Sequence, residues 1–257
     1  MYQISNFMDN DDVKTLSQLG PFSVIEYQRD LSVTPSSAVT AYYCAEMNVK
    51  KRQLVCDLSR ANVTIQAGAM QWMLGNVNAT TGVKGVGDLF GKAVRGKVSG
   101  ESAIKPEYTG DGLLVLEPTY RHLILLDMAD WNGSVVLDDG LFLACDSQLK
   151  HKAVMRSNIS SAVAGGEGLF NLSLNGSGAF CIESECPREE LIEITLNNDV
   201  LKVDGNFALA WSSSLDFTVE RSGKSLIGSA ASGEGLVNVY RGTGKVLMMP
   251  TAKMPNI

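Results

Sequence analysis

The chain has 257 residues, of which 22 are Lys or Arg and 28 are Asp or Glu, so its net charge is −6. Apolar residues make up 45% of the sequence and charged residues 19%, a composition typical of globular domains and unlike disordered or collagen-like chains. The acidic balance argues against general affinity for nucleic acid or anionic lipid, because both require clustered positive charge. Composition thus indicates a folded chain but no particular activity.

The sequence shows no targeting or membrane-spanning segment. Residues 1–12 contain neither the basic start nor the apolar stretch of a signal peptide. The longest apolar runs, at 122–126 and 141–145, are about five residues long, whereas a membrane-spanning helix needs about 18. We therefore expect no membrane span and a cytoplasmic location.

Residues 1–44 are expected to form an N-terminal extension that joins the first of three repeated units. Its acidic residues would cover an edge strand or reach a neighbouring molecule. The basic cluster Lys50-Lys51-Arg52 follows. Three adjacent side chains on a strand point to both faces, so this cluster does not predict a single RNA-binding patch.

A glycine-rich pattern occurs three times, beginning at Gly100, Gly166 and Gly233, with offsets of 66 and 67 residues. Each copy reads Gly-Glu, a spacer, Gly-x-Gly and an apolar run. Glycines that recur at equal offsets predict one backbone geometry used three times, with positive φ or a close approach of a neighbouring strand. The structural turn glycines are expected to be Gly100, Gly110, Gly112, Gly166, Gly168, Gly176, Gly178, Gly233, Gly235, Gly242 and Gly244.

This repeat divides the rest of the chain into units at 45–118, 119–184 and 185–257, the last including the tail. In the third unit, apolar residues alternate with polar ones from Ile192 to Leu196, which predicts strands with one buried face. Turn signals at 197–199, 204–205 and 242–244 separate the runs. The pattern predicts an all-β fold of barrels or rolled sheets. Because one such unit buries its apolar face poorly alone, we expect three around a pseudo-threefold axis.

One segment departs from the strand pattern. Apolar residues from Val86 to Val94 recur at helical spacing and predict one short amphipathic helix near residues 86–98. Neighbouring residues, among them Lys92 and Arg95, make this segment locally basic. A basic helix of this kind is either a solvated face or a surface that docks on phosphate.

These motifs together resemble the bacterial branch of the altered-inheritance-of-mitochondria family. The resemblance rests on Gly-Glu-Gly-Leu-x-Asn followed by Gly-x-Gly, on Leu-Ala-Trp at 209–211, and on the segment leading into Gly100-Glu101. It covers nearly the whole chain, although Ser102 stands where the other copies have glycine. The resemblance implies a fold similar to the tryptophan RNA-binding attenuation protein (TRAP), with a short double-stranded β-helix unit present three times. The mitochondrial branch is linked to inner-membrane organisation, and the bacterial branch has no established activity.

The five cysteines do not suggest a metal or disulfide framework. Their number is odd and their spacing scattered, and only the pair at 181 and 186 is close in sequence. A zinc site needs about four ligands at paired spacing. We therefore expect the thiols to act as small apolar core residues, and we expect no metal or cofactor.

The sequence contains no recognisable catalytic set. Its two histidines, His122 and His151, both follow basic residues, and the chain has neither a Gly-x-Ser-x-Gly elbow nor a phosphate-binding loop. Three glutamates, Glu101, Glu167 and Glu234, recur with the glycine pattern. Under threefold symmetry they would occupy equivalent places and converge on a cation or a basic partner. Alternatively, each accepts hydrogen bonds from its own local turn.

We therefore expect a non-enzymatic binding or scaffold protein that presents a rigid β platform to a protein partner or a small ligand. Two alternatives remain, an RNA-binding module by fold analogy and an enzyme that uses carboxylates alone. A ring completed within one chain makes a monomer plausible without excluding an oligomer.

Overall fold

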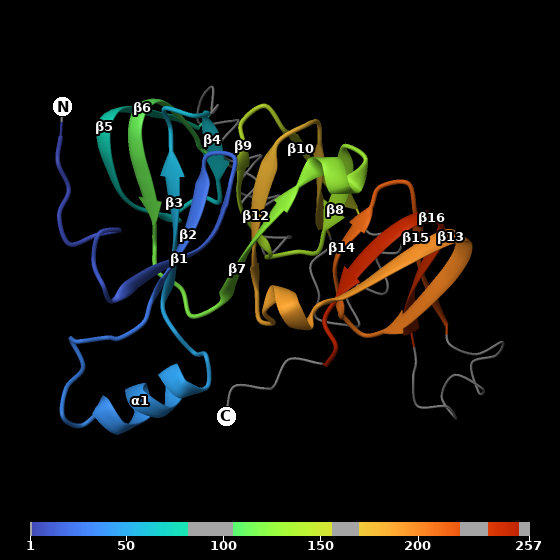
Figure 1. Cartoon of the computed structure of the whole chain (residues 1–257). Helices are drawn as coiled ribbons and strands as arrows, with labels where there is room; N and C mark the ends of the chain where they lie inside the picture. Colours follow the sequence, from blue (N-terminus) through green and yellow to red (C-terminus); the bar gives the residue numbers. More distant parts are fainter. Residues whose placement is uncertain (1, 82–104, 156–169, 222–235, 252–257) are drawn as a thin grey trace, which may run out of the picture.

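The computed structural model of the chain describes residues 2–81, 105–155, 170–221 and 236–251 (Figure 1). Within these ranges the protein is mostly β structure, arranged in two curled antiparallel sheets. Three helical segments accompany them, α1 (Ala38–Glu46), η1 (Met128–Trp131) and η2 (Arg188–Glu190). The predicted β class is confirmed.

The first sheet contains β1 (Val13–Leu19), β2 (Phe22–Tyr27), β3 (Arg52–Asp57), β4 (Val63–Ile65), β5 (Met70–Thr80), β6 (Glu107–Leu116), β7 (His122–Asp127), β9 (Phe142–Asp146) and β12 (Ala179–Ser184). Its order is β1-β2-β3-β6-β4-β9-β12-β7, and β5 pairs with β6. The N-terminal strands β1 and β2 thus extend the sheet that β3 begins. The boundary proposed after residue 44 falls within α1.

The second sheet contains β8 (Ser134–Leu137), β10 (Lys150–Met155), β11 (Phe170–Asn175), β13 (Ile192–Asp204), β14 (Ala208–Ser212), β15 (Asp216–Arg221) and β16 (Leu236–Met248). Its order is β10-β11-β8-β14-β16-β13, and β15 pairs with β16. The expected turns at 197–199 and 242–244 are wrong, because both segments lie inside long strands. They lie opposite each other, where the register of β13 against β16 shifts between Leu196 and Asp199.

The described strands do not show the expected pseudo-threefold ring. Pairing of β4 with β9 joins the first and second sequence units, and pairing of β8 with β14 joins the second and third. Within the described ranges, no strand pairing joins the first unit to the third. The two junctions are equivalent, because Val63 lies opposite Asp146 at the first and Val135 lies opposite Ser212 at the second, in the same register. The strands of the first and third units lie at opposite ends of the molecule (Figure 1).

The hydrophobic interior crosses the boundaries between the sequence units. One cluster of buried side chains includes Phe22 from β2 and Cys181 from β12. Another includes Leu137 from β8 and Leu247 from β16. Since burial of apolar surface is the main favourable term in folding, neighbouring units stabilise each other.

The first glycine of each Gly-x-Gly has the same backbone conformation in all three units. Gly110, Gly176 and Gly242 have φ of 122°, 129° and 117°, values that side chains rarely allow. Gly176 lies between β11 and β12, whereas Gly110 and Gly242 lie within β6 and β16 and not in turns. The spacing of these glycines therefore reflects one geometry that occurs in each sequence unit.

Candidate functional site

The connection between β2 and β3 leaves the sheet and carries α1. We call residues 28–51 the helical arm; its helix lies beyond the ends of β1, β2 and β3 (Figure 1). None of the α1 side chains is buried. The helix ends at Glu46 with Met47 as its C-cap, and Asn48 follows with φ of 62°, a left-handed conformation that commonly terminates helices.

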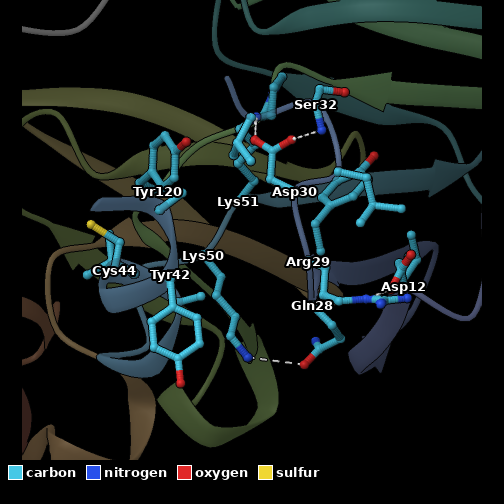
Figure 2. A pocket seen from close by; sticks show the side chains of 18 of the residues that line it. Asp12, Gln28, Arg29, Asp30, Ser32, Tyr42, Cys44, Lys50, Lys51 and Tyr120 are labelled. Atoms are coloured by element: carbon cyan, nitrogen blue, oxygen red, sulfur yellow. Dashed lines mark hydrogen bonds and ion pairs between the residues drawn. The ribbon is translucent and has the colours of Figure 1, made fainter. Parts of the chain in front are cut away.

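Polar contacts fasten the base of the helical arm. Lys51 Nζ lies 2.6 Å from Asp30 Oδ2, and Lys50 Nζ donates to Gln28 Oε1 at 3.1 Å (Figure 2). The Tyr27 N–H donates to the Lys51 carbonyl at 3.0 Å. The two ends of the arm are therefore held together where they join the sheet.

Arg52 is the buried anchor beneath the helical arm. Its side chain is only 2% exposed, and Nη2 lies 2.7 Å from Glu26 Oε2 on the neighbouring strand. Nη2 also donates to the Asn48 carbonyl at 3.1 Å and to Asn48 Oδ1 at 2.9 Å. Burying both charges is costly, and these hydrogen bonds offset that cost while fixing the exit of α1 to the sheet.

The basic cluster at 50–52 therefore offers no free positive patch. Lys51 pairs with Asp30, whereas Arg52 and, at 3.8 Å, Lys50 both approach Glu26. Each cation has an acidic neighbour, so the local field that RNA binding requires is reduced.

A groove of about 1250 Å³ separates the helical arm from the sheet. Small residues of α1, among them Ala38, Ala41 and Ala45, line one side together with Tyr42. Tyr120, labelled with Tyr42 in Figure 2, also lines the groove. The opposite side comes from the strands of the first sheet and from the segment before β1.

A chain of hydrogen bonds lines the sheet side of the groove. The Tyr27 hydroxyl donates to Gln53 Oε1, and Gln53 Nε2 donates to Gln71 Oε1 at 2.7 Å and to the Leu116 carbonyl at 2.9 Å. Gln53 is 3% exposed, so its amide is fixed. Burial raises the pKa of Tyr27, and nearby Lys51 partly opposes this, so the phenol remains a donor at neutral pH.

Aromatic side chains add apolar surface to the same groove. The rings of Phe7 and Trp72 meet edge to face with centroids 5.2 Å apart, and both residues line the groove. Aromatic walls beside fixed polar groups are typical of binding sites.

A second, smaller hollow of about 600 Å³ lies where β7 begins, and it is lined by His122, Arg121, Glu185 and Glu190. Burial lowers the pKa of His122, as does the nearby charge of Arg52, so its imidazole is neutral at physiological pH. Arg121 Nε lies 3.0 Å from Glu185 Oε1. This imidazole has no activated nucleophile beside it among the described residues.

The cysteines behave as the sequence predicts. Cys56, Cys145, Cys181 and Cys186 are buried, and Cys44 is partly so. Cys181 and Cys186 belong to different core clusters and do not form one site. Burial, aided by a hydrogen bond to Glu190, raises the pKa of Cys186 to about 11. The described ranges contain no cluster of three metal-binding side chains.

The three repeated glutamates, Glu101, Glu167 and Glu234, lie outside the described residues, so their convergence remains a prediction. The helix expected near residues 86–98 lies outside them too. So do five of the repeated glycines, Gly100, Gly166, Gly168, Gly233 and Gly235. His122 and His151 belong to different sheets, so the two imidazoles do not form one site.

Sequence reasoning missed both α1 and the groove. Thr34-Pro35-Ser36-Ser37 followed by alanines at 38, 41 and 45 is a usable signal, because Ser is favoured at helix starts and Ala within helices.

These features define a two-sheet β protein with a groove beneath a helical arm. A family profile described as Mitochondrial biogenesis AIM24 matches residues 46–251. The chain belongs to this family, as the repeated motifs predicted. The match begins at the last residue of α1, so β1, β2 and most of the helical arm precede it.

Proteins of Streptococcus pyogenes are similar to this chain. An uncharacterised protein of serotype M6 is 33% identical over 193 residues, which cover 72% of this chain and 75% of that protein. A crystal structure of an S. pyogenes protein, from the Northeast Structural Genomics Consortium, is 30% identical with a TM-score of 0.57. The similarity covers 80% of this chain and 90% of that one. Similarity to TRAP remains a prediction.

No helix among the described residues is long and apolar enough to cross a bilayer.

Proposed function

We propose that the protein is a non-enzymatic binding protein, and that its groove holds an extended segment of a protein partner. The observation that carries the proposal is the hydrogen-bond chain centred on Gln53, which fixes amide groups along the sheet side of the groove. The first sheet acts as the rigid platform, and the helical arm forms the opposing wall.

The size of the groove favours a peptide segment over a small metabolite. Small-molecule sites usually measure about 300–1000 Å³. This groove measures about 1250 Å³ and is lined from the N-terminal segment through α1 to β5. An extended chain fills a site of this length better than a compact ligand does.

The chemistry of the groove fits the same class of partner. The side-chain amide of Gln71 matches the donors and acceptors of a peptide backbone. Trp72, Tyr42 and Tyr120 offer surfaces for apolar side chains. The charges at the rim, Asp12 with Arg29 and Asp30 with Lys51, already neutralise each other, which disfavours a strongly charged ligand.

We further propose that the platform consists of three repeated units related to the double-stranded β-helix, divided as the sequence suggests, and that it acts in the cytoplasm. Shared φ values at Gly110, Gly176 and Gly242 support the repeat. The free state of all five cysteines supports a reducing compartment.

Site-specific photocrosslinking in the native host tests the partner. A benzophenone side chain in place of Tyr42 faces the groove, and the same group in place of Val200 on β13 is the control. We expect one protein to be captured from position 42 and not from position 200. Equal capture from both positions would contradict the proposal.

Affinity measurements with the purified partner test the groove chemistry. We expect Gln71→Ala to weaken binding about five-fold, corresponding to about 1 kcal/mol for one lost hydrogen bond. Gln18→Ala removes the same kind of side chain from β1, outside the groove, and is expected to leave affinity unchanged. Equal affinities for both variants would exclude the groove.

The RNA-binding alternative has less support, because the cations at 50–52 have acidic neighbours. The carboxylate-enzyme alternative rests on the three repeated glutamates, which lie outside the described residues.

A further inference from the structure

The face of α1 that points away from the groove is apolar and uncovered. Val39, Tyr43 and Met47 recur every four residues, so they lie along one side of the helix. Their exposed fractions are 67%, 64% and 77%. None of the three lines the groove, whereas Ala38, Ala41 and other α1 residues do. The helix thus has one face toward the groove and a separate apolar face toward solvent.

Packing against the described residues stabilises this helix little, because its side chains are at most partly buried. It has nine residues and no buried side chain. Isolated helices shorter than about 12 residues are marginal in water, and most helices in proteins depend on burying an apolar face. The polar contacts at the base fix the ends of the helical arm but leave the outer stripe uncovered.

The charges at the two ends of α1 are also uncompensated. The charged residue of α1 is Glu46. It lies at the C-terminal end of the helix, where the helix dipole disfavours an acid. The first turn contains no acidic residue, and the N-cap residue Ser37 makes no side-chain capping bond. Its hydroxyl instead accepts from the Thr34 N–H at 3.1 Å. The N-terminal end therefore lacks the negative charge that Glu46, at the C-terminal end of an antiparallel helix, would supply.

We propose that α1 packs antiparallel against α1 of a second copy of the chain. A two-fold axis beside Tyr43 places Tyr43 against Tyr43 of the second copy, and Val39 against its Met47. The same arrangement places Glu46 beside the first turn of the opposite helix, where the helix dipole favours an acid. A two-fold interface requires one self-complementary surface, and this stripe meets that requirement.

The expected dimer is weak. One short helix from each copy buries less surface than the roughly 1,200 Å² of a standard stable interface. We therefore expect a dissociation constant in the micromolar range or above, on the order of 100 µM. The alanines that line the groove lie on the other face of α1, and only Glu46 belongs to both the groove lining and the proposed contact, so dimer formation does not require the partner segment.

Cysteine crosslinking tests the arrangement in the full-length protein. The background is Cys44→Ser, because Cys44 is partly exposed while the other four cysteines are buried. Tyr43→Cys is expected to form a disulfide-linked dimer under mild oxidation. Val39→Cys and Met47→Cys are each expected to crosslink poorly alone, whereas a mixture of the two proteins forms a crosslinked heterodimer. Val200→Cys on β13 is the exposed control.

Sedimentation measures the association without any introduced thiol. The native chain is expected to shift from monomer to dimer around 100 µM, and Tyr43→Ser is expected to raise the dissociation constant at least about ten-fold. A native chain that stays monomeric to about 1 mM would overturn the proposal, as would Val39→Cys alone crosslinking better than the mixture. Circular dichroism of each variant confirms that the β structure is retained. Capture of a different protein from position 42 would leave this result unaffected, so the two proposals fail independently.

Discussion

Arg52 organises the region around the groove, because its one guanidinium contacts β2, the end of the helical arm and the connection between β6 and β7. It lies against Glu26 on β2 and Asn48 after α1, and donates at 3.4 Å to the Tyr120 carbonyl after β6. Its Nε is buried and has no hydrogen-bond partner, so the other nitrogens carry the compensation for desolvation. Such a residue fixes the geometry of the arm more than it adds net stability.

Arg52→Met is expected to lower the free energy of unfolding by about 3 kcal/mol, because it leaves a buried carboxylate without its closest cation. The loss lies at the low end of the usual range because Lys50 remains 3.8 Å from Glu26. Urea denaturation measures it. Arg29→Met removes an exposed cation from Asp12 and is expected to cost far less. Equal losses for the two variants would show that burial is not the deciding factor.

Asp146 is expected to make stability depend on pH. Burial raises the pKa of this carboxyl, and the nearby charge of Asp127 raises it further. A hydrogen bond from the Ala179 N–H, at 2.7 Å, lowers the pKa but does not cancel the effect of burial. As pH rises above the ordinary value of 3.8, the folded state holds this proton more tightly than the unfolded state, so the free energy of unfolding falls. Asp146→Asn should therefore gain stability relative to the native chain as pH rises from about 4 through the raised pKa. Denaturation curves at several pH values measure the difference, and a difference that does not change with pH would refute this assignment.

At the scale of elements, the second glycine of each repeated Gly-x-Gly shows why the sequence repeats. A Cβ on Gly112 would lie 2.0 Å from the Leu74 carbonyl oxygen, and one on Gly244 would lie 2.8 Å from Ser212 Cβ. A Cβ on Gly178 would lie 2.5 Å from Asp146 Oδ2. Asp146 and Ser212 each accept a backbone N–H from the residue after the glycine, at 2.7 and 3.0 Å. Close approach of the neighbouring strand thus demands glycine in every unit.

Gly112→Ala is expected to destabilise the protein by about 3 kcal/mol, and Gly244→Ala by about 1 kcal/mol. The difference arises because a Cβ on Gly112 would lie 2.0 Å from a backbone carbonyl oxygen of β5, whereas the atom nearest to one on Gly244 is Ser212 Cβ, at 2.8 Å. Thermal and urea denaturation of both variants provide the comparison. The reverse order of stability would show that the strands near Gly112 adjust more easily than the side chains near Gly244.

The sequence predicted the strands that bury one face in the core. It did not predict the elements that lack a buried face. Alternation in β13 and β15 identified both strands, because period two follows from one-sided burial. The helix α1 gave no such signal, because none of its residues faces the core. Polar and glycine-rich segments at 197–199 and 242–244 looked like turns, yet they pair across a bend in two long strands. A glycine in the sequence indicates that an unusual φ is needed at that position. Whether the chain also reverses direction there depends on how strands distant in the sequence pair.

At the scale of the whole molecule, the arrangement of the units was the least predictable feature. Recurrence of a motif indicates similar units but does not specify which strands join them. Here β4 pairs with β9 at one junction and β8 pairs with β14 in the same register at the other, but no pairing among the described strands joins the third unit to the first. The groove was equally hidden, since its lining comes from segments far apart in the sequence, such as Phe7, Tyr42 and Tyr120.

The shared interiors predict that the described sheets unfold together. The cluster that holds Trp131 and Phe180 also holds Leu247 and Met249, so loss of the third unit would expose the core of the second. We expect a single calorimetric transition with equal calorimetric and van't Hoff enthalpies, and we expect a chain truncated after residue 184 not to fold. Two resolved transitions would indicate independent domains.

The bond from Tyr27 to Lys51 closes β2 and β3 at the point where the helical arm departs. The strands below it pair from Phe22 opposite Cys56 to Glu26 opposite Arg52. An excursion of another length or sequence is therefore expected to leave the sheet intact, provided that it keeps Asn48, to which the buried Arg52 donates. Grafting another relative's excursion between these strands is then a direct way to change the groove.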